Sequence, residues 1–206
     1  HRVFPASELA DPAFRSNPPL RCYHCKRALF AALRRIAGAE GLRHVLDGSN
    51  ADDASDYRPG ARACRELKVR SPLRDAGLSK AEVRLLSRAL RLPTWDKPAR
   101  ACLASRFPYG RPIDAKSLMR VERAEDALIR LGFGQVRVRH HGPVARVETA
   151  AADFGRMLDA ATRAKISRRL KRLGYAYVAL DLDGYRTGSL NEPLNRKRRR
   201  GAGARR

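Results

Sequence analysis

The sequence predicts a mixed α/β fold built in two parts. Helical and strand-like patterns alternate along the chain, in the order β-α-α after a long first helix and α-β-β-α-β after that. Pro108, Gly110 and Pro112 cluster in the string "RFPYGRPID", which indicates a boundary between the parts. Apolar residues make up 43% of the 206 residues, enough for a core. No apolar run approaches the ~18 residues that a membrane-spanning helix needs.

The first part is expected to begin with a helix and to contain one short strand. Apolar residues recur at helical spacing in "RCYHCKRALFAALRRIAGAEGLR". Residues 44–50, "HVLDGSN", predict a short buried strand that ends in a polar loop. Pro59 suits the start of a helix over "GARACREL". Ser79 and Glu82, three residues apart, predict a capping box at the start of the next helix, which Pro93 ends.

The second part combines two helices with three strands. "DAKSLMRVERAEDALIRLG" predicts a long amphipathic helix that Gly132 ends. The alternating runs "QVRVRHH" and "VARVETA", joined at "HGP", predict a hairpin. Residues 151–174 predict one continuous helix, and "YAYVALDL" predicts a final strand.

The net charge of +23 comes mainly from arginines that are scattered along the predicted helices. Seven positive groups and no acid lie in residues 195–206, which leaves +16 for the rest of the chain. This low-complexity tail is expected to be disordered. The remaining charge predicts either weak, salt-sensitive binding of polyanions or simply solvated helix faces, and the second interpretation is favoured.

The four cysteines are too few for a disulfide framework, and no secretory segment follows the first residues. A cytoplasmic location is therefore expected, where cysteines bind metal, act in catalysis or are buried. Cys64 lies inside a helical pattern and is expected in the core. Cys22 and Cys25, in "CYHCK", have the spacing for two thiolates on one metal or cluster iron, or for a redox pair.

Cys102 is the candidate nucleophile. It lies in a loop between Arg100 and Arg106, and guanidinium groups near a thiol favour its thiolate form. Ser105 and Arg106 just beyond it suit a phosphate or carboxylate. No histidine is close in sequence, so nothing indicates a Cys-His protease pair. The alternative is that Cys102 is a small apolar residue beneath the loop.

Two further groups of residues suit ligand binding. Residues 47–53, "DGSNADD", lie at the end of a predicted strand, where open α/β sheets bind ligands, although an Asx-rich turn is favoured by spacing alone. Arg137 and Arg139 share one strand face, as an anion clamp requires, and Arg146 lies on the paired strand. Charged residues on the exposed face of a hairpin are an equally ordinary explanation. Glu125 and Glu148 are candidates for hard oxygen ligands.

Several long strings together resemble one family, in order and over residues 1 to about 194. They are "NPPLRCYHCKRALF", "DGSNADDASDYRPG", "VRSPLRDAGLSKAEVRLLSRALRLPTWDKPARACLASRFPYG", "VRVRHHGPVARVE" and "VALDLDGYRTGSLNE". The family is that of the LarE-type, ATP-dependent sacrificial sulfur transferases of the PP-loop pyrophosphatase superfamily.

The resemblance implies the fold and the domains. Residues 1–107 would be the remainder of a PP-loop ATP pyrophosphatase domain with a parallel sheet, and residues 108–194 a small α+β domain for substrate binding and oligomerisation. The family begins with a strand and the loop "SGGxDS", which cradles the ATP phosphates, and no such string is present here. We therefore expect an N-terminally truncated chain that cannot activate a carboxylate with ATP by itself.

The resemblance also implies a reaction. ATP and Mg would adenylate a carboxylate of pyridinium-3,5-biscarboxylic acid mononucleotide, and the Cys102 thiolate would attack the acyl-adenylate. Cleavage of the carbon–sulfur bond of Cys102 would leave sulfur on the product, a precursor of the nickel-pincer cofactor of lactate racemase. In a second branch of the family, three cysteines hold a [4Fe-4S] cluster that carries the sulfur. Cys22, Cys25 and Cys102 match that set, which favours the cluster route.

The resemblance also implies which residues bind the substrate phosphate, a metal and the nucleotide. The substrate phosphate would be bound by Ser105, Arg106, Arg137 and Arg139. A metal between the subunits of a homo-oligomer, a hexamer in the family, would be bound by Glu125 and Glu148. The nucleotide would lie near Asp47, Asn50 and Asp53.

The sequence is also compatible with two alternatives. The first is another PP-loop enzyme, such as a tRNA thiolase or an amide-forming ligase, for which the basic surface would suit RNA. The second is a non-catalytic remnant that binds polyanions through its arginines and tail. For the sulfur transferase itself, nucleic-acid binding is expected to be weak and nonspecific, with no membrane association.

Overall fold

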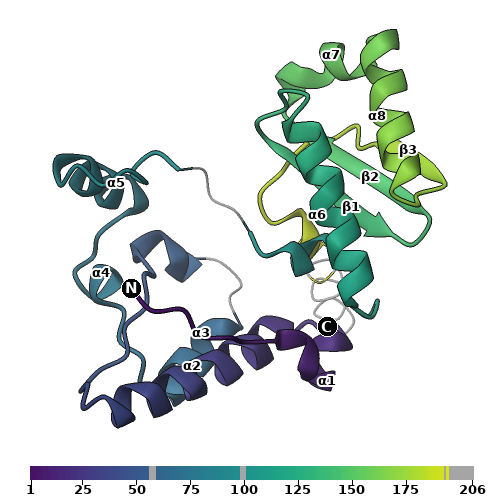
Figure 1. Cartoon of the computed structure of the whole chain (residues 1–206). Helices are drawn as coiled ribbons and strands as arrows, with labels where there is room; N and C mark the ends of the chain where they lie inside the picture. Colours follow the sequence, from purple (N-terminus) through teal and green to yellow (C-terminus); the bar gives the residue numbers. More distant parts are fainter. Residues whose placement is uncertain (56–58, 98–100, 193, 195–206) are drawn as a thin grey trace, which may run out of the picture. The chain divides into compact units, whose positions relative to one another are not determined.

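The computed structural model describes residues 1–55, 59–97, 101–192 and 194. It forms two compact units, His1–Arg100 and Ala101–Arg206, which are described separately (Figure 1). The first unit ends at residue 100, seven residues before the predicted domain boundary after residue 107. The Cys102 loop therefore belongs to the second unit. The domain assignment itself stays a prediction. The predicted basic tail lies outside the described residues.

The first unit is helical in its described part. Its elements are a 3-10 turn at Glu8–Ala10, α1 (Pro12–Arg15), α2 (Arg21–Ala39), a 3-10 turn at Ala51–Ser55, α3 (Gly60–Glu66), α4 (Pro72–Asp75) and α5 (Lys80–Ala89). Helices α2 and α3 pack together around Phe30, Cys64 and Val69. Cys64 is only 5% exposed, which confirms its predicted place in the core.

Helix α5 begins as the sequence predicts. Ser79 Oγ accepts a hydrogen bond from the Glu82 N–H at 3.3 Å, and Glu82 Oε2 accepts one from the Ser79 N–H at 2.8 Å. This reciprocal pair satisfies two backbone donors that the first helical turn leaves free. The helix ends at Ala89, ahead of Pro93.

The predicted strand over residues 44–50 is wrong. This segment forms a single parallel bridge, between Leu46 and Arg70, in the described part of the chain. Its backbone makes two hydrogen bonds there, from Arg70 N to Val45 O at 3.1 Å and from Asp47 N to Arg70 O at 2.9 Å. Two bonds do not make the ladder that defines a strand. Leu46 is 56% exposed, so the apolar run does not pack as a buried strand would.

The second unit contains a mixed three-stranded sheet. Its main elements are α6 (Ala115–Ile129), β1 (Val136–His141), β2 (Val144–Thr149), α7 (Phe154–Leu158), α8 (Ala160–Arg172) and β3 (Tyr177–Leu180). The strand order is β1-β2-β3. Strands β1 and β2 form the predicted antiparallel hairpin, with Val138 opposite Val147, and β3 is parallel to β2.

The two faces of this sheet differ in chemistry. Helices α6 and α8 pack on one face, where Leu128, Val138, Val147 and Leu170 lie in a continuous apolar core (Figure 1). Residues alternate between faces along a strand, so the arginines and the glutamate of the hairpin lie on the other face.

The predicted helix over residues 151–174 is divided into α7 and α8. The break falls at Asp159, whose backbone is not helical, with φ −50° and ψ 135°. Its carboxylate accepts a hydrogen bond from the Thr162 N–H at 2.9 Å and so caps α8. Aspartate is among the preferred N-cap residues, and its capping of a new helix outweighs continuation of the helical pattern.

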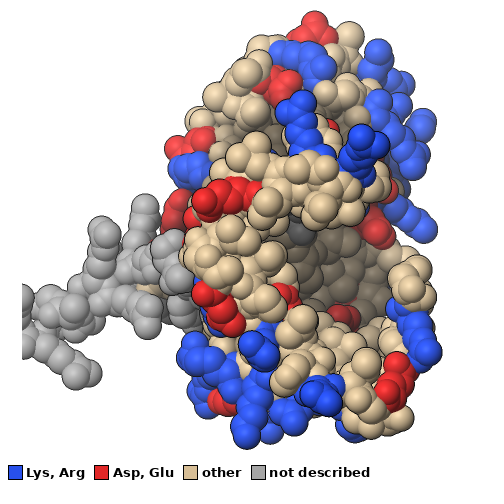
Figure 2. Space-filling model, turned by 90° about the vertical axis from the view of Figure 1, so that its left-hand side faces the viewer, with Lys and Arg blue, Asp and Glu red and all other residues tan. Residues whose placement is uncertain are grey.

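The surface is rich in lysine and arginine. Figure 2 shows these side chains spread over the visible face of the molecule, with acidic side chains between them. Helix α8 alone carries six exposed cations and no acid: Arg163, Lys165, Arg168, Arg169, Lys171 and Arg172. Among the described helices, none combines the length and the apolar character needed to cross a membrane.

Leu170→Ala should strongly destabilise the second unit. Leu170 is 0% exposed in the core between α8 and the sheet, so its truncation should lower the free energy of unfolding by about 2–5 kcal/mol. Native-state amide hydrogen exchange of β1 and β2 measures this change. The matched control is Leu158→Ala, because Leu158 is 55% exposed and its loss should change the same exchange little. Equal effects of the two substitutions would contradict the packing described here.

Candidate functional site

Cys102 lies in a short loop of the second unit, directly before a 3-10 turn over Leu103–Arg106. Its side chain is exposed and takes no part in a disulfide. The residues that follow are anchored, since Ala104 and Phe107 are 1% and 0% exposed. The loop therefore presents a thiol to solvent from an anchored backbone. Arg100, the other predicted neighbour, lies outside the described residues.

Arg106 is buried and joins this loop to helix α6. Its Nε and Nη2 form a two-pronged ion pair with the Glu125 carboxylate, at 2.8 and 2.9 Å. Its Nη1 donates to the carbonyl oxygens of Ala101 and Cys102, at 3.0 and 3.1 Å, and to Ser105 Oγ at 2.9 Å. The structure thus brings together four of the predicted site residues.

A second buried ion pair crosses the hairpin. Arg139 Nε and Nη2 donate to the two oxygens of Glu148, both at 2.7 Å. Glu148 is 0% exposed. Arg139 also donates to the Ser105 carbonyl at 2.8 Å and to Ser189 Oγ at 2.7 Å. The guanidinium therefore ties the hairpin to the Cys102 loop and to the segment after β3.

Arg146 has a donor that no described residue accepts from. Its Nη2 donates to Glu148 at 3.3 Å, and its Nη1 donates to Asp181. Its Nε is buried and has no hydrogen-bond partner within the described residues. A buried N–H without an acceptor costs about 1–3 kcal/mol. A ligand oxygen would recover that cost. The sequence placed Arg146 on the hairpin without assigning it a ligand.

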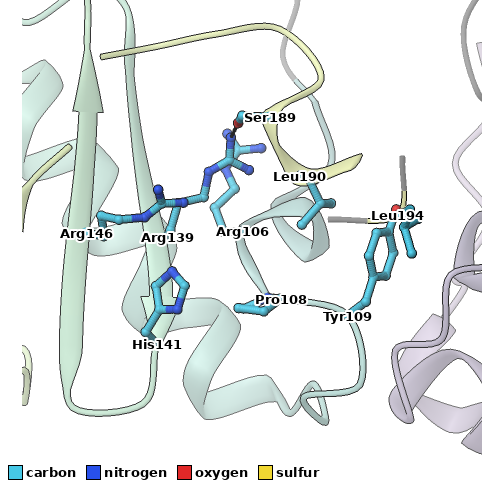
Figure 3. Close-up of a pocket in the computed structure, with 9 residues that line it drawn as sticks. All are labelled: Arg106, Pro108, Tyr109, Arg139, His141, Arg146, Ser189, Leu190 and Leu194. Carbon is cyan, nitrogen blue, oxygen red and sulfur yellow. Dashed lines mark hydrogen bonds between the residues drawn. The ribbon is translucent and has the colours of Figure 1, made fainter. Parts of the chain in front are cut away.

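The arginines Arg106, Arg139 and Arg146 line a pocket of about 260 Å³, shown in Figure 3. Arg139, His141 and Arg146 come from the hairpin, and Pro108 and Tyr109 come from the loop after Cys102. The other lining residues are Arg106, Ser189, Leu190 and Leu194. Three of the lining residues are arginines, and each has a carboxylate partner. What the pocket offers an anion is therefore chiefly a set of fixed N–H and O–H donors.

His141 is a pocket residue that the sequence analysis missed. Loss of solvent around its ring lowers its pKa, and the positive charges of Arg146 and Arg139 lower it further. The ring is thus held neutral at neutral pH beside an anion-binding group of residues. The signal was present in the sequence, because His141 shares the strand face of Arg137 and Arg139.

Arg137, predicted to bind phosphate, is not among the residues that line this pocket. Its guanidinium lies over the Tyr185 ring, 5.1 Å from the centroid, and donates to the Val136 carbonyl at 2.8 Å. Burial lowers its pKa, and the charge of Arg106 adds to that effect. Its role in binding phosphate stays a prediction.

The loop over residues 47–53 is organised by its own side chains. Asp47 accepts hydrogen bonds from Ser71 Oγ at 2.6 Å and Ser49 Oγ at 2.8 Å, and Lys26 Nζ lies 3.7 Å away. Burial alone would raise the pKa of Asp47, but these hydrogen bonds and the Lys26 charge hold it below its usual value. Asp53 accepts from the Asn50 N–H at 3.0 Å. Asp47 thus fits a role in shaping the loop, and its proximity to a nucleotide stays a prediction.

Cys22 and Cys25 lie in the first turns of α2. Residues three apart share a helix face, so their thiols fit as two ligands of one iron. Cys22 is exposed and Cys25 half-buried, and both belong to the first unit. Their cooperation with Cys102 of the second unit stays a prediction.

The predicted metal ligands Glu125 and Glu148 are each occupied by an arginine. No group of three or more His, Cys, Asp or Glu residues in the described ranges is arranged to hold a metal ion. A metal at either glutamate would have to displace a guanidinium from both carboxylate oxygens. The assignment of Glu125 and Glu148 as metal ligands stays a prediction, and metal binding there would require loss of these ion pairs.

Cys102 is exposed, and its backbone carbonyl is bonded by Arg106, which lines a pocket of fixed anion donors. On an α/β framework, this arrangement fits a thiol-dependent enzyme that acts on an anionic substrate. A protein of Lactiplantibacillus plantarum named pyridinium-3,5-bisthiocarboxylic acid mononucleotide synthase is 39% identical over 188 residues, covering 91% of this chain and 67% of its own length. An uncharacterized protein of Synechocystis sp. is 44% identical over 196 residues, covering 95% and 73%.

An uncharacterized protein of Methanocaldococcus jannaschii is 30% identical over 171 residues, covering 83% of this chain and 66% of its own length. No family model matches the chain. The extent and identity of these matches show that the chain belongs to the LarE-type sulfur transferases, a family of enzymes in the PP-loop superfamily. The resemblance seen in the sequence is thereby confirmed.

Sulfate should bind the pocket more tightly as the pH falls from about 8 to about 5, because sulfate keeps its charge over this range while His141 gains one. The pKa of His141 is lowered from its usual value, so the ring is neutral at neutral pH in the free protein, and a bound anion favours its protonation. Titration of sulfate at constant ionic strength, followed by NMR of the His141 ring, measures the effect. His141→Gln should abolish the pH dependence. An affinity that does not change with pH would contradict the role of His141.

Proposed function

We propose that this protein transfers sulfur to a carboxylate of a pyridinium dicarboxylate mononucleotide, in nickel-pincer cofactor biosynthesis. One observation carries the proposal: Arg106 lines the donor pocket and also holds the backbone of the exposed Cys102. The loop that carries the thiol and a pocket of anion donors are thus joined through one residue. The relative from L. plantarum, whose name describes a bisthiocarboxylic acid mononucleotide, supports the choice of substrate.

The chemistry follows from a thiol as sulfur donor. ATP with Mg converts the substrate carboxylate into an acyl-adenylate and releases pyrophosphate. The Cys102 thiolate attacks the acyl carbon, AMP leaves, and a thioester forms. Removal of the Cα proton of Cys102 then drives its electron pair into a Cα–Cβ double bond. The Cβ–Sγ bond breaks, a thiocarboxylate leaves, and dehydroalanine remains in the chain.

In this route each chain supplies one sulfur atom, so a product with two thiocarboxylates consumes two chains. A cluster route avoids this loss. Cys22, Cys25 and Cys102 would hold a [4Fe-4S] cluster, which when bound supplies a transferable sulfide at the iron that no cysteine ligates. Both routes depend on Cys102, and they differ in whether they need Cys22 and Cys25.

The pocket residues bind the substrate phosphate in this proposal. Of the residues that line the pocket, Arg139 and Arg146 supply guanidinium donors and Ser189 supplies a hydroxyl. Ser105, whose hydroxyl accepts from Arg106, does not line the pocket and stays a predicted phosphate ligand. The unused Nε of Arg146 is the donor that a phosphate oxygen would satisfy. The loop over residues 47–53 would lie near the nucleotide, and a homo-oligomer would complete the enzyme.

Cys102→Ser should abolish sulfur transfer while leaving ATP–pyrophosphate exchange intact, because adenylation does not use the thiol. The protein isolated anaerobically from the cells that make it is the material to assay. Loss of the elements of hydrogen sulfide from Cys102, seen by intact mass and fragmentation, identifies the sacrificial route.

The Cys22→Ser variant separates the two routes. It should retain one turnover in the sacrificial route and lose all transfer in the cluster route, because the cluster would lose a ligand. Full sulfur transfer by Cys102→Ser would overturn the proposed function, whichever result Cys22→Ser gives.

A further inference from the structure

The guanidinium of Arg106 is almost fully used within the protein. An arginine has five N–H donors in a planar fork. Four of these donors face acceptors: Nε and one Nη2 N–H bond the two oxygens of Glu125. The two N–H groups of Nη1 are shared among the carbonyls of Ala101 and Cys102 and Ser105 Oγ. The residue is 3% exposed. Such a side chain has little left to offer a substrate.

Glu125 connects this guanidinium to the rigid part of the unit. It is 8% exposed on α6, and its Oε1 also accepts the Val138 N–H at 2.9 Å. Val138 belongs to β1, an edge strand of the sheet in the described part of the chain, and its N–H bonds to the carboxylate in place of a further strand. One carboxylate therefore joins a helix, a strand and, through Arg106, the carbonyl of Cys102.

The loop is held from its other end as well. The Ser105 carbonyl accepts from Arg139 at 2.8 Å, and the Ser105 N–H donates to the Cys102 carbonyl at 2.9 Å. Cys102 thus has its backbone carbonyl bound twice, once by Arg106 and once by Ser105, while its side chain is exposed. The loop restrains the backbone and leaves the sulfur accessible.

We infer that Arg106 and Glu125 are positioning residues, which act as a bracket that holds the backbone of Cys102 so that its sulfur meets the acyl carbon. This inference rests on the proposed function, in which Cys102 reacts. Displacement of a reacting group by about 1 Å can cost ~10²-fold in rate, so a fixed loop has a large effect on the thiol step. Arginine is required because a lysine ammonium lacks the planar fork.

In this inference Arg106 positions the Cys102 backbone and does not bind the substrate phosphate. Experiment can separate these two roles. Loss of a phosphate ligand weakens substrate binding, which raises the half-saturating substrate concentration. Loss of a positioning residue slows the step after binding. The test uses Arg106→Lys and Glu125→Gln in the whole protein, assayed by single-turnover sulfur transfer over a range of substrate concentrations.

For both variants we expect the maximum transfer rate to fall about 10²-fold with an unchanged half-saturating concentration and unchanged ATP–pyrophosphate exchange. Amide exchange at Ser105 and Phe107 should quicken at least ~10-fold, because their loop is released. Alkylation of Cys102 relative to Cys22, measured in the same sample by peptide mass spectrometry, should change in both variants, since Cys22 lies in the first unit and serves as an internal reference.

Leu170→Ala is the matched control, because it destabilises the same unit and touches neither the loop nor the pocket. It should leave the transfer rate and the alkylation ratio unchanged at a temperature where the unit is folded. A raised half-saturating concentration with a normal loop would assign Arg106 to the substrate and overturn the inference. Normal transfer by Cys102→Ser would instead overturn the proposed function, and the exchange and alkylation data would still report on the bracket.

Discussion

The geometry of the site depends on the buried ion pair between Arg106 and Glu125. Burying two charges costs several kcal/mol for each ion, and the cost is offset only when the remaining donors and acceptors are satisfied. Here Glu125 also accepts a strand N–H, and Arg106 also donates to two carbonyls of the loop. Removal of one partner would leave an uncompensated buried charge, at a cost of about 3–5 kcal/mol. The loop conformation is therefore tied to the stability of the unit.

In the hairpin, one carboxylate offsets the repulsion between two arginines. Its register places Arg139 directly opposite Arg146, and like charges in that arrangement destabilise a sheet. Glu148 accepts hydrogen bonds from both, and Asp181 takes the other side of Arg146. A fully buried glutamate is thus what allows two guanidinium groups to share one sheet face beside the pocket. The functional donors and the fold are stabilised by the same contacts.

Local patterns in the sequence predicted the local features, namely the α5 capping box, the hairpin, and Cys64 in the core. They failed where tertiary contacts determine the secondary structure, as in the strand expected over residues 44–50. The break at Asp159 had a signal, since aspartate favours an N-cap, but the helical pattern masked it. The pairing of Arg106 with Glu125, 19 residues apart, and of Arg139 with Ser189, 50 apart, leaves no periodic trace. The resemblance located the residues, and only the structure shows which of them bind one another.

The span of these contacts along the chain has a consequence for folding. Tyr109 Oη donates to Asn191 Oδ1 at 3.0 Å across 82 residues, and Ser189 meets Arg139 across 50. Closing such long loops costs entropy, which is recovered only when the intervening helices and strands are in place. The pocket is therefore complete only when the segment after β3, which supplies Ser189 and Leu190, is bound to the hairpin and to the loop at Tyr109. An anion that binds there selects fully folded chains by mass action and protects the whole unit against unfolding.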